Sequence, residues 1–87
     1  MTDLMIHGST LANDLKLPPQ AKTILRHLEK GKTISPLEAL MVYGIYRLSD
    51  CIFKIRNAGH DVITHDRVDE RGRKYGDYQL NQRLTLN

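Results

Sequence analysis

The sequence has few of the residues and patterns that mark enzymes, metalloproteins and membrane proteins. Its one cysteine, Cys51, cannot form an internal disulfide and suits a reducing compartment. No glycine-rich phosphate loop, catalytic triad or evident carboxylate pair is present, so we expect neither catalysis nor a cofactor. The histidines lack the spacing of metal ligands, and we expect no metal site among them: His7, His27, His60 and His65.

Long apolar runs are also missing. No run approaches the roughly 20 residues of a membrane span, and the first residues lack the basic-then-apolar layout of a signal peptide. We therefore expect a soluble, cytoplasmic protein without membrane contact. A length of 87 residues and a hydrophobic content of 40% fit one small globular domain.

Positive charge is concentrated in the middle of the sequence. Residues 16–59 contain eight Lys or Arg against three Asp or Glu, whereas residues 1–15 contain two Asp and no cation. Residues 60–87 contain five of each sign, and the net charge of the chain is +3. This distribution suits a polyanionic partner, although many soluble domains are equally basic.

Two helices are predicted between residues 18 and 44. The first begins at the proline pair 18–19, which a first helical turn tolerates, and ends at Gly31. The second begins with a capping box, in which the Ser35 hydroxyl accepts from the Glu38 amide and the Glu38 carboxylate reaches back. Gly44 can adopt the left-handed conformation that stops it. The second helix carries one apolar stripe: Leu37, Leu40 and Met41.

A third helix is predicted over residues 47–58, with Gly59 as its stop. Leu48, Ile52 and Ile55 share one face, and Cys51 lies beside them as a small buried hydrophobe. The rest of the circumference is rich in groups that can contact phosphates or base edges: Arg47, Ser49, Asp50, Phe53, Lys54, Arg56 and Asn57.

After Gly59 the sequence pattern changes to a period of two. Residues 61–68 and 74–80 are predicted as the strands of a hairpin. The glycine of the polar turn 69–72 stands too late for a two-residue turn, so we expect a longer or bulged loop. Two helices joined around a glycine form a helix-turn-helix, and the hairpin makes it a winged helix. The predicted fold is mainly α with a small β-hairpin: a flexible arm (1–17), a winged helix-turn-helix domain (18–80) and a tail (81–87).

The runs Ser35-Pro-Leu-Glu-Ala-Leu, Tyr43-Gly-Ile-Tyr-Arg-Leu-Ser and Ala58-Gly-His resemble a family of short helix-turn-helix proteins, found mostly in bacteriophages and prophages. The resemblance spans residues 19–80. It implies a winged helix-turn-helix fold, double-stranded DNA as the partner, and a role as a transcriptional regulator or accessory factor in a bacterial or phage-infected cell. Asp50 departs from the pattern, because a small or basic residue is expected there and a carboxylate repels phosphate.

The third helix carries the residues expected to read DNA. Arg47, at its start, is placed to reach base edges in the major groove, or it is solvated or paired with Asp50. Asp50 can accept from a cytosine amino group, but capping of the helix N-terminus is favoured. Phe53 could touch a thymine methyl, but we expect it to be buried. Lys54 and Arg56 are candidates for phosphate contacts or for an ordinary solvated face.

Further DNA contacts are expected from the turn before the third helix and from the hairpin. Cations at the wing tip could rest on the DNA backbone or in the minor groove, or nearby acids could neutralise them. We expect the tyrosines to pack, except Tyr46, whose hydroxyl could bond a phosphate. The predicted DNA-binding residues are Tyr46, Arg47, Ser49, Asp50, Lys54, Arg71, Arg73 and Lys74.

Other partners remain open at this point. A winged helix is stable without DNA, so the exposed third helix could instead dock on a protein, for example a host protein that a phage inhibits. Single-stranded nucleic acid and RNA are disfavoured because the sequence lacks an aromatic-basic platform. A DNA-binding domain this small needs a homodimer, cooperative neighbours or a partner protein for useful affinity.

Overall fold

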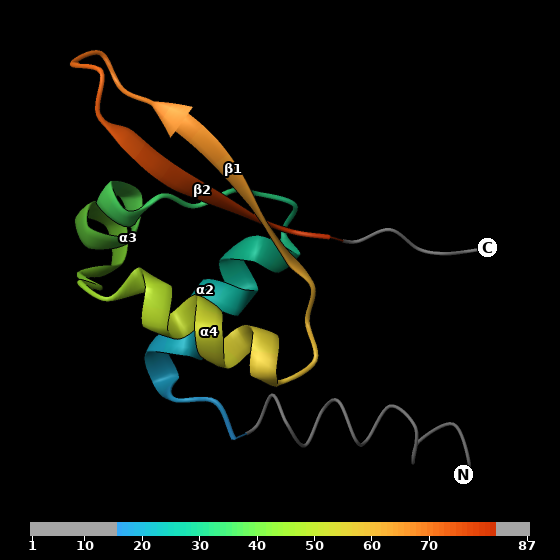
Figure 1. The fold of residues 1–87 in the computed structure, drawn as a ribbon. Helices are drawn as coiled ribbons and strands as arrows, with labels where there is room; N and C mark the ends of the chain where they lie inside the picture. The colour runs from blue at the N-terminus through green and yellow to red at the C-terminus, as the bar shows by residue number, and fades with distance from the viewer. Residues whose placement is uncertain (1–15, 82–87) are drawn as a thin grey trace, which may run out of the picture.

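The computed structural model describes residues 16–81, which form three helices followed by a hairpin (Figure 1). The helices are α2 (Pro19–Glu29), α3 (Pro36–Tyr43) and α4 (Leu48–Asn57), and the strands are β1 (Val62–Val68) and β2 (Lys74–Leu80). The predicted order of elements is confirmed. Most of the predicted arm (1–17) and tail (81–87) lies outside the described residues. Within the described range, no helix is long and apolar enough to cross a membrane.

The proline pair and Gly31 bound α2 as the sequence predicts. Pro19 occupies the first turn, where its missing amide hydrogen breaks no helix bond. Gly31 has a φ of +82° and donates its N–H to the carbonyl of Leu28 at 2.9 Å, so the last turn ends in a tight bend. The apolar residues at helical spacing are all buried: Ala21, Ile24, Leu25 and Leu28.

The start and stop signals of α3 are also confirmed. The Ser35 hydroxyl accepts from the amide of Glu38 at 3.2 Å, as half of the predicted capping box requires. The Glu38 carboxylate is directed elsewhere, with its Oε2 at 3.8 Å from the ring of His27. At the other end, Gly44 has a φ of +69°, and its N–H donates to the carbonyl of Leu40. Four residues separate α3 from α4, which begins at Leu48 rather than at the predicted Arg47.

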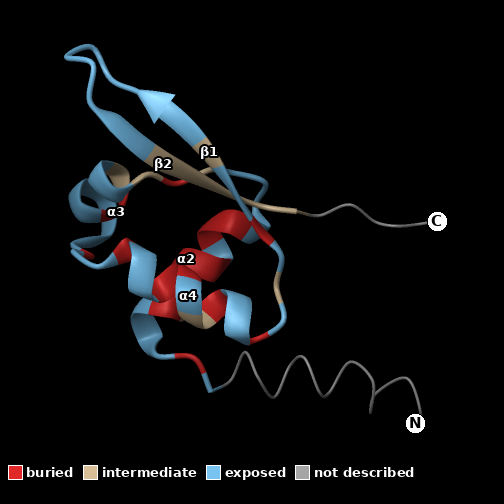
Figure 2. Ribbon diagram, viewed as in Figure 1, coloured by how far each residue is buried: buried red, intermediate tan, exposed pale blue. Residues whose placement is uncertain are grey.

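The core lies mainly between α2 and α4, which pack against each other (Figure 2). Tyr78 and Leu80 of β2 cover it from the hairpin side, in the orientation expected from their spacing. Leu17 is buried as well, so packing begins one residue before the predicted domain boundary. The largest fully buried side chains are Ile24, Leu28, Ile34, Leu48, Ile52 and Ile55.

The wing is an antiparallel hairpin that projects beyond the helices (Figure 1). Its register runs from Val62 opposite Leu80 to Val68 opposite Lys74, which leaves the loop 69–73 at the tip. The Oδ1 of Asp69 accepts from the amides of Arg71 and Arg73, both at 2.8 Å, and holds the loop closed. The predicted longer loop is therefore confirmed.

Both strands of the wing are tied to the helical part. On one side, the guanidinium of Arg56 in α4 donates to the Val62 carbonyl at 2.7 Å and to the Thr64 hydroxyl at 3.0 Å. On the other side, Ile34 and Tyr78 exchange two backbone hydrogen bonds of 2.9 and 2.8 Å. The link between α2 and α3 thus acts as a one-residue third strand, and the wing is fixed to the bundle.

Candidate nucleic-acid interface

The outward face of α4 is the first part of the candidate interface. Leu48, Cys51, Ile52 and Ile55 are buried against the core, as their spacing predicts. At 100° per residue, the side opposite them is centred on Asn57, with Phe53 and Asp50 on either side of it. The exposed residues of this side are Ser49, Asp50, Phe53, Arg56 and Asn57.

The expected burial of Phe53 is wrong, because its side chain is 62% exposed. Four smaller apolar residues already fill the inward side of α4, which leaves no core position at Phe53. An exposed aromatic ring therefore lies close to the middle of the helix face that was predicted to contact phosphates and base edges.

Tyr46, Arg47 and Ser49 come together where α4 begins. Tyr46 is 84% exposed in the turn between α3 and α4, unlike Tyr78, which packs against the core. Arg47 is exposed at the N-cap position, and its side chain makes no capping hydrogen bond. Its carbonyl accepts from the amide of Cys51, so the backbone is held while the guanidinium extends into solvent.

Asp50 pairs with Lys54 rather than with Arg47. Its Oδ2 lies 3.0 Å from Nζ of Lys54, one turn further along α4, and both side chains are about half exposed. Such an exposed pair contributes at most about 0.5 kcal/mol to stability. Asp50 makes no N-cap hydrogen bond, although the helix dipole favours a carboxylate in the first turn. Two predicted DNA-binding residues thus partly neutralise each other.

Arg56 has a structural task, since its guanidinium is bonded to β1 as described above. It is therefore a poor candidate for a phosphate contact. Lys54, by contrast, lies beside Lys16, Asn57 and the segment that enters α2, along a shallow groove of the surface. The groove therefore places Lys54 of α4 near Lys16, which precedes α2.

The wing tip is the second part of the candidate interface. Arg71, Arg73 and Lys74 are all exposed there, as predicted. Two of the four acids expected to neutralise them are engaged elsewhere: Asp69 bonds the loop amides, and Asp77 pairs with Arg67 at 3.4 Å. The other two, Asp66 and Glu70, are exposed on the wing. Within the described residues, no ion pair reaches the three tip cations, so their charge is available to a ligand.

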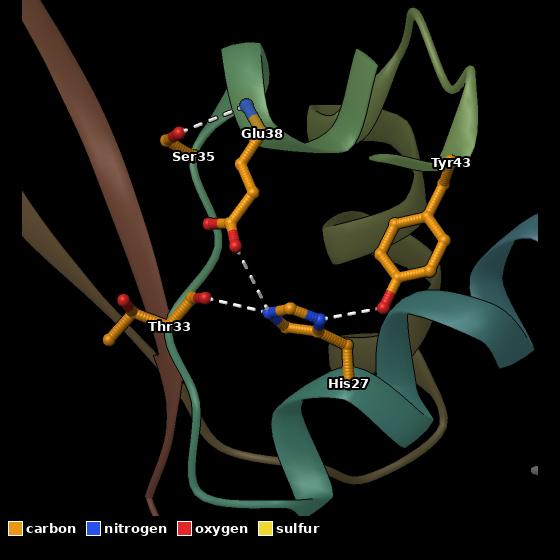
Figure 3. Close-up of polar contacts among 5 residues, drawn as sticks. All are labelled: His27, Thr33, Ser35, Glu38 and Tyr43. Carbon is orange, nitrogen blue, oxygen red and sulfur yellow. Dashed lines mark hydrogen bonds and ion pairs between the residues drawn. The ribbon is translucent and has the colours of Figure 1, made fainter. Parts of the chain in front are cut away.

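Sequence reasoning missed the role of His27, which it treated only as a scattered histidine. Its ring is 6% exposed and bonds two segments at once (Figure 3). Nε2 lies 2.8 Å from the Thr33 carbonyl and Nδ1 lies 2.7 Å from the Tyr43 hydroxyl. Because a carbonyl can only accept, Nε2 carries the hydrogen, and in this tautomer Nδ1 accepts from the Tyr43 hydroxyl. The sequence did contain a signal for the burial of His27, because this residue stands three positions after Ile24 and so lies on the inward side of α2.

His27 matters for the interface because it positions α3. Only Ala39 of this helix is buried, so apolar packing alone holds it weakly. The bond from His27 fixes its C-terminal turn, and the Glu38 carboxylate approaches the same ring from its N-terminal turn. α3 in turn fixes the turn that presents Tyr46 and Arg47.

Cys51 is buried, as expected for a small apolar side chain. Burial raises the pKa of its thiol above the ordinary value, and the neighbouring Asp50 carboxylate raises this pKa further. The thiol is therefore protonated at neutral pH and is a poor nucleophile. Across residues 16–81, no three His, Cys, Asp or Glu side chains gather as metal ligands.

Comparison with known proteins gives one match. A family model described as a winged helix-turn-helix domain matches residues 19–83, which is most of the chain. No curated protein and no solved structure shows a significant match.

Proposed function

Because the chain belongs to the winged helix-turn-helix domain family, we propose that it binds double-stranded DNA, with the start of α4 in the major groove and the wing on the backbone. The observation that carries this proposal is the pairing of two exposed elements. The turn into α4 presents Tyr46 and Arg47, and the wing tip presents three exposed cations, none of them in an ion pair within the described residues.

The chemistry of these groups suits DNA. Residues at the start of a recognition helix reach base edges, and a bidentate arginine–guanine contact contributes about 1–3 kcal/mol of discrimination. The Tyr46 and Ser49 hydroxyls can bond phosphate oxygens, and the wing cations can neutralise them. In this arrangement Arg47 reads sequence, whereas Arg71, Arg73 and Lys74 hold the backbone.

We further propose a biological role as a transcriptional regulator or accessory factor of the phage or prophage type. The support for this finer role is the resemblance of the runs 35–40, 43–49 and 58–60 to proteins of that kind. It is independent of the contacts described above.

Fluorescence anisotropy with labelled genomic and random duplexes over a salt series tests the DNA proposal. If about five or six cations contact phosphates, log K against log salt has a slope of roughly −5. Arg47→Ala should weaken binding to a preferred sequence about tenfold. Arg26→Ala is the matched control, because it removes the same exposed charge from α2 and should change affinity less than twofold. Absence of duplex binding at low salt would contradict the proposal.

A second candidate, a module that docks on a protein such as a host factor, is favoured by one observation. Phe53 on the outward side of α4 and Tyr46 in the turn before this helix are exposed aromatic side chains, and aromatic residues are enriched at protein interfaces. Phe53→Ser separates the two functions. If DNA is the partner, this variant should keep the affinity of the wild type for the preferred duplex, while Arg47→Ala does not. If a protein is the partner, the wild type, Phe53→Ser and Arg47→Ala should all have negligible affinity for duplex DNA.

A further inference from the structure

We propose that a groove between α3 and the wing binds a short extended peptide that carries acidic and apolar residues. This α3–wing groove lies between the first turn of α3 and the outer end of β2, and it is lined by residues 35–37, Asp69, Arg73, Lys74 and Tyr75 (Figure 1). Its volume is about 340 Å³, at the lower end of the range for ligand sites in proteins. The proposal does not depend on DNA binding.

One wall of the α3–wing groove is apolar and exposed. Leu37 is 68% exposed on α3, and Tyr75 is 38% exposed on β2. Leu37 cannot turn into the core, because the rotation of α3 is fixed at its ends by the buried Ile34 and Ile45. An exposed apolar surface rimmed by polar groups is characteristic of a binding groove. A ligand that covers this wall needs apolar side chains of its own.

The other wall is cationic. Arg73 and Lys74 are exposed, and neither is in an ion pair within the described residues. Asp69 also lines the groove, but its Oδ1 accepts from two loop amides, which compensate part of its charge. Glu38, in the first turn of α3, is directed to His27. The balance of charge therefore favours carboxylates on the ligand.

The free edge of β2 favours a peptide as the ligand. In an antiparallel pair, alternate residues direct their N–H and C=O groups away from the partner strand. Tyr78 is such a residue, because it exchanges two backbone hydrogen bonds with Ile34 on the side away from β1. Lys74, four residues earlier, directs its backbone groups the same way and has no backbone partner there among the described residues. A peptide in the groove can pair with Lys74 as Ile34 pairs with Tyr78, by strand addition to an open sheet edge.

The combination of an apolar wall, two cations and an open strand edge distinguishes this ligand from a nucleic acid. A phosphate backbone can pair with Arg73 and Lys74, but it brings no aliphatic group to Leu37 and no peptide backbone to the edge of β2. The two cations are also proposed to contact duplex DNA. A protein that displays such a peptide should therefore compete with a duplex for the wing.

Fluorescence anisotropy with a labelled Glu-Val-Glu-Leu-Glu peptide, in the absence of DNA, tests the proposal. We expect a dissociation constant of roughly 10⁻⁵ to 10⁻⁴ M, and about tenfold weaker binding of the same peptide with Gln in place of Glu. Leu37→Ser should weaken binding about fivefold. Met41→Ser is the matched control: it removes a 75% exposed side chain one turn further along α3, outside the groove, and should change affinity less than about twofold. Circular dichroism checks that both variants fold.

A second pair of variants separates the groove from general attraction to the wing. Arg73→Gln removes a cation that lines the groove and should weaken peptide binding about fivefold. Arg71→Gln removes a cation from the same wing tip but outside the groove, and should weaken it less than about twofold. Equal losses for Arg73→Gln and Arg71→Gln, or for Leu37→Ser and Met41→Ser, would overturn the proposal.

Hydrogen exchange measured by NMR tests the backbone pairing. The bound peptide should slow exchange of the Lys74 amide several-fold, whereas the Tyr78 amide, already bonded to Ile34, should exchange as before. A bound peptide that leaves the Lys74 amide unprotected would refute strand addition and the proposal with it. So would equal binding of the Glu and Gln peptides, or no binding at about 1 mM peptide. Each of these results leaves the DNA proposal unaffected.

Discussion

His27 shows how one buried polar side chain can position an element that has little apolar packing of its own. It joins α2 to the carbonyl before α3 and to the last residue of α3 (Figure 3). Each bond satisfies a group that would otherwise be partly buried without a partner, and such groups are costly. The accuracy with which α3 is placed depends on this ring.

Replacement of His27 should therefore destabilise the fold. His27→Ala removes the donor to Thr33, removes the acceptor for Tyr43 and leaves a cavity, so the free energy of unfolding should fall by about 2–4 kcal/mol. Tyr43→Phe loses one hydrogen bond and should lower it by about 1 kcal/mol. Urea denaturation measures both changes. Tyr46→Phe, at an 84% exposed position, is the control and should have almost no effect; equal values for all three would refute the positioning role.

The Cys51 thiol gives a prediction that depends on pH. Its pKa in the folded protein lies above the ordinary 9.0, so ionisation is easier in the unfolded chain. The stability associated with the neutral thiol is fully present below pH 9.0 and is lost as the pH rises through the folded pKa. When denaturation is measured at increasing alkaline pH, the free energy of unfolding of the wild type should fall, and Cys51→Ala should lack the part of this fall that comes from the thiol. A colorimetric thiol reagent at pH 8 should react with the wild type only after urea is added; rapid reaction of the folded protein would show the thiol to be accessible.

Phe53 and His27 mark the limit of prediction from sequence at this scale. Hydrophobicity favoured burial of Phe53, but the inward side of α4 is already complete with four smaller side chains. The histidine was weighed only as a metal ligand, whereas its spacing from Ile24 and Leu28 placed it on the core side of α2. In both cases the position on the helix determined the outcome, and the residue type did not.

The elements themselves were predictable because local signals determine where they begin and end. The Ser35 cap, the proline pair and the glycines after α2 and α3 act through backbone geometry that does not depend on distant packing. Burial on α3 was not predictable in the same way, because its stripe looks like an ordinary core face. Only the packed arrangement of Ile34, Ala39 and Ile45 shows that α3 turns its stripe outward.

Gly44 provides a test of the turn that joins α3 to α4. Its φ of +69° strains any residue with a Cβ, and no atom lies within 4 Å of where that Cβ would stand. Gly44→Ala should therefore cost only the backbone strain, about 1–2 kcal/mol of unfolding free energy. Gly44→Asn should cost less, because asparagine tolerates this conformation. Thermal or urea unfolding would measure both, and a larger loss for Asn than for Ala would exclude strain as the cause.

Across the whole molecule, the balance of charge at the interface depends on Asp50. It partly neutralises Lys54 and places a negative charge beside the groups proposed to meet phosphate. Asp50→Asn should raise the affinity for random duplexes several-fold and make the salt slope steeper by about 1. Glu29→Gln, which removes a negative charge from α2, outside the candidate interface, is the control for the change in net charge. If Asp50 instead accepts from a cytosine, Asp50→Asn would weaken binding to one sequence and leave the slope unchanged.

The two ties between the wing and the helices have a consequence for any duplex target. Arg56 holds one strand and Ile34 holds the other, so the wing cannot swing independently of α4. In the proposed complex, the distance between the phosphate bound by the wing and the base pair contacted by α4 would therefore be constant. A target with one base pair inserted between these two points would offer the protein one contact or the other, but not both together.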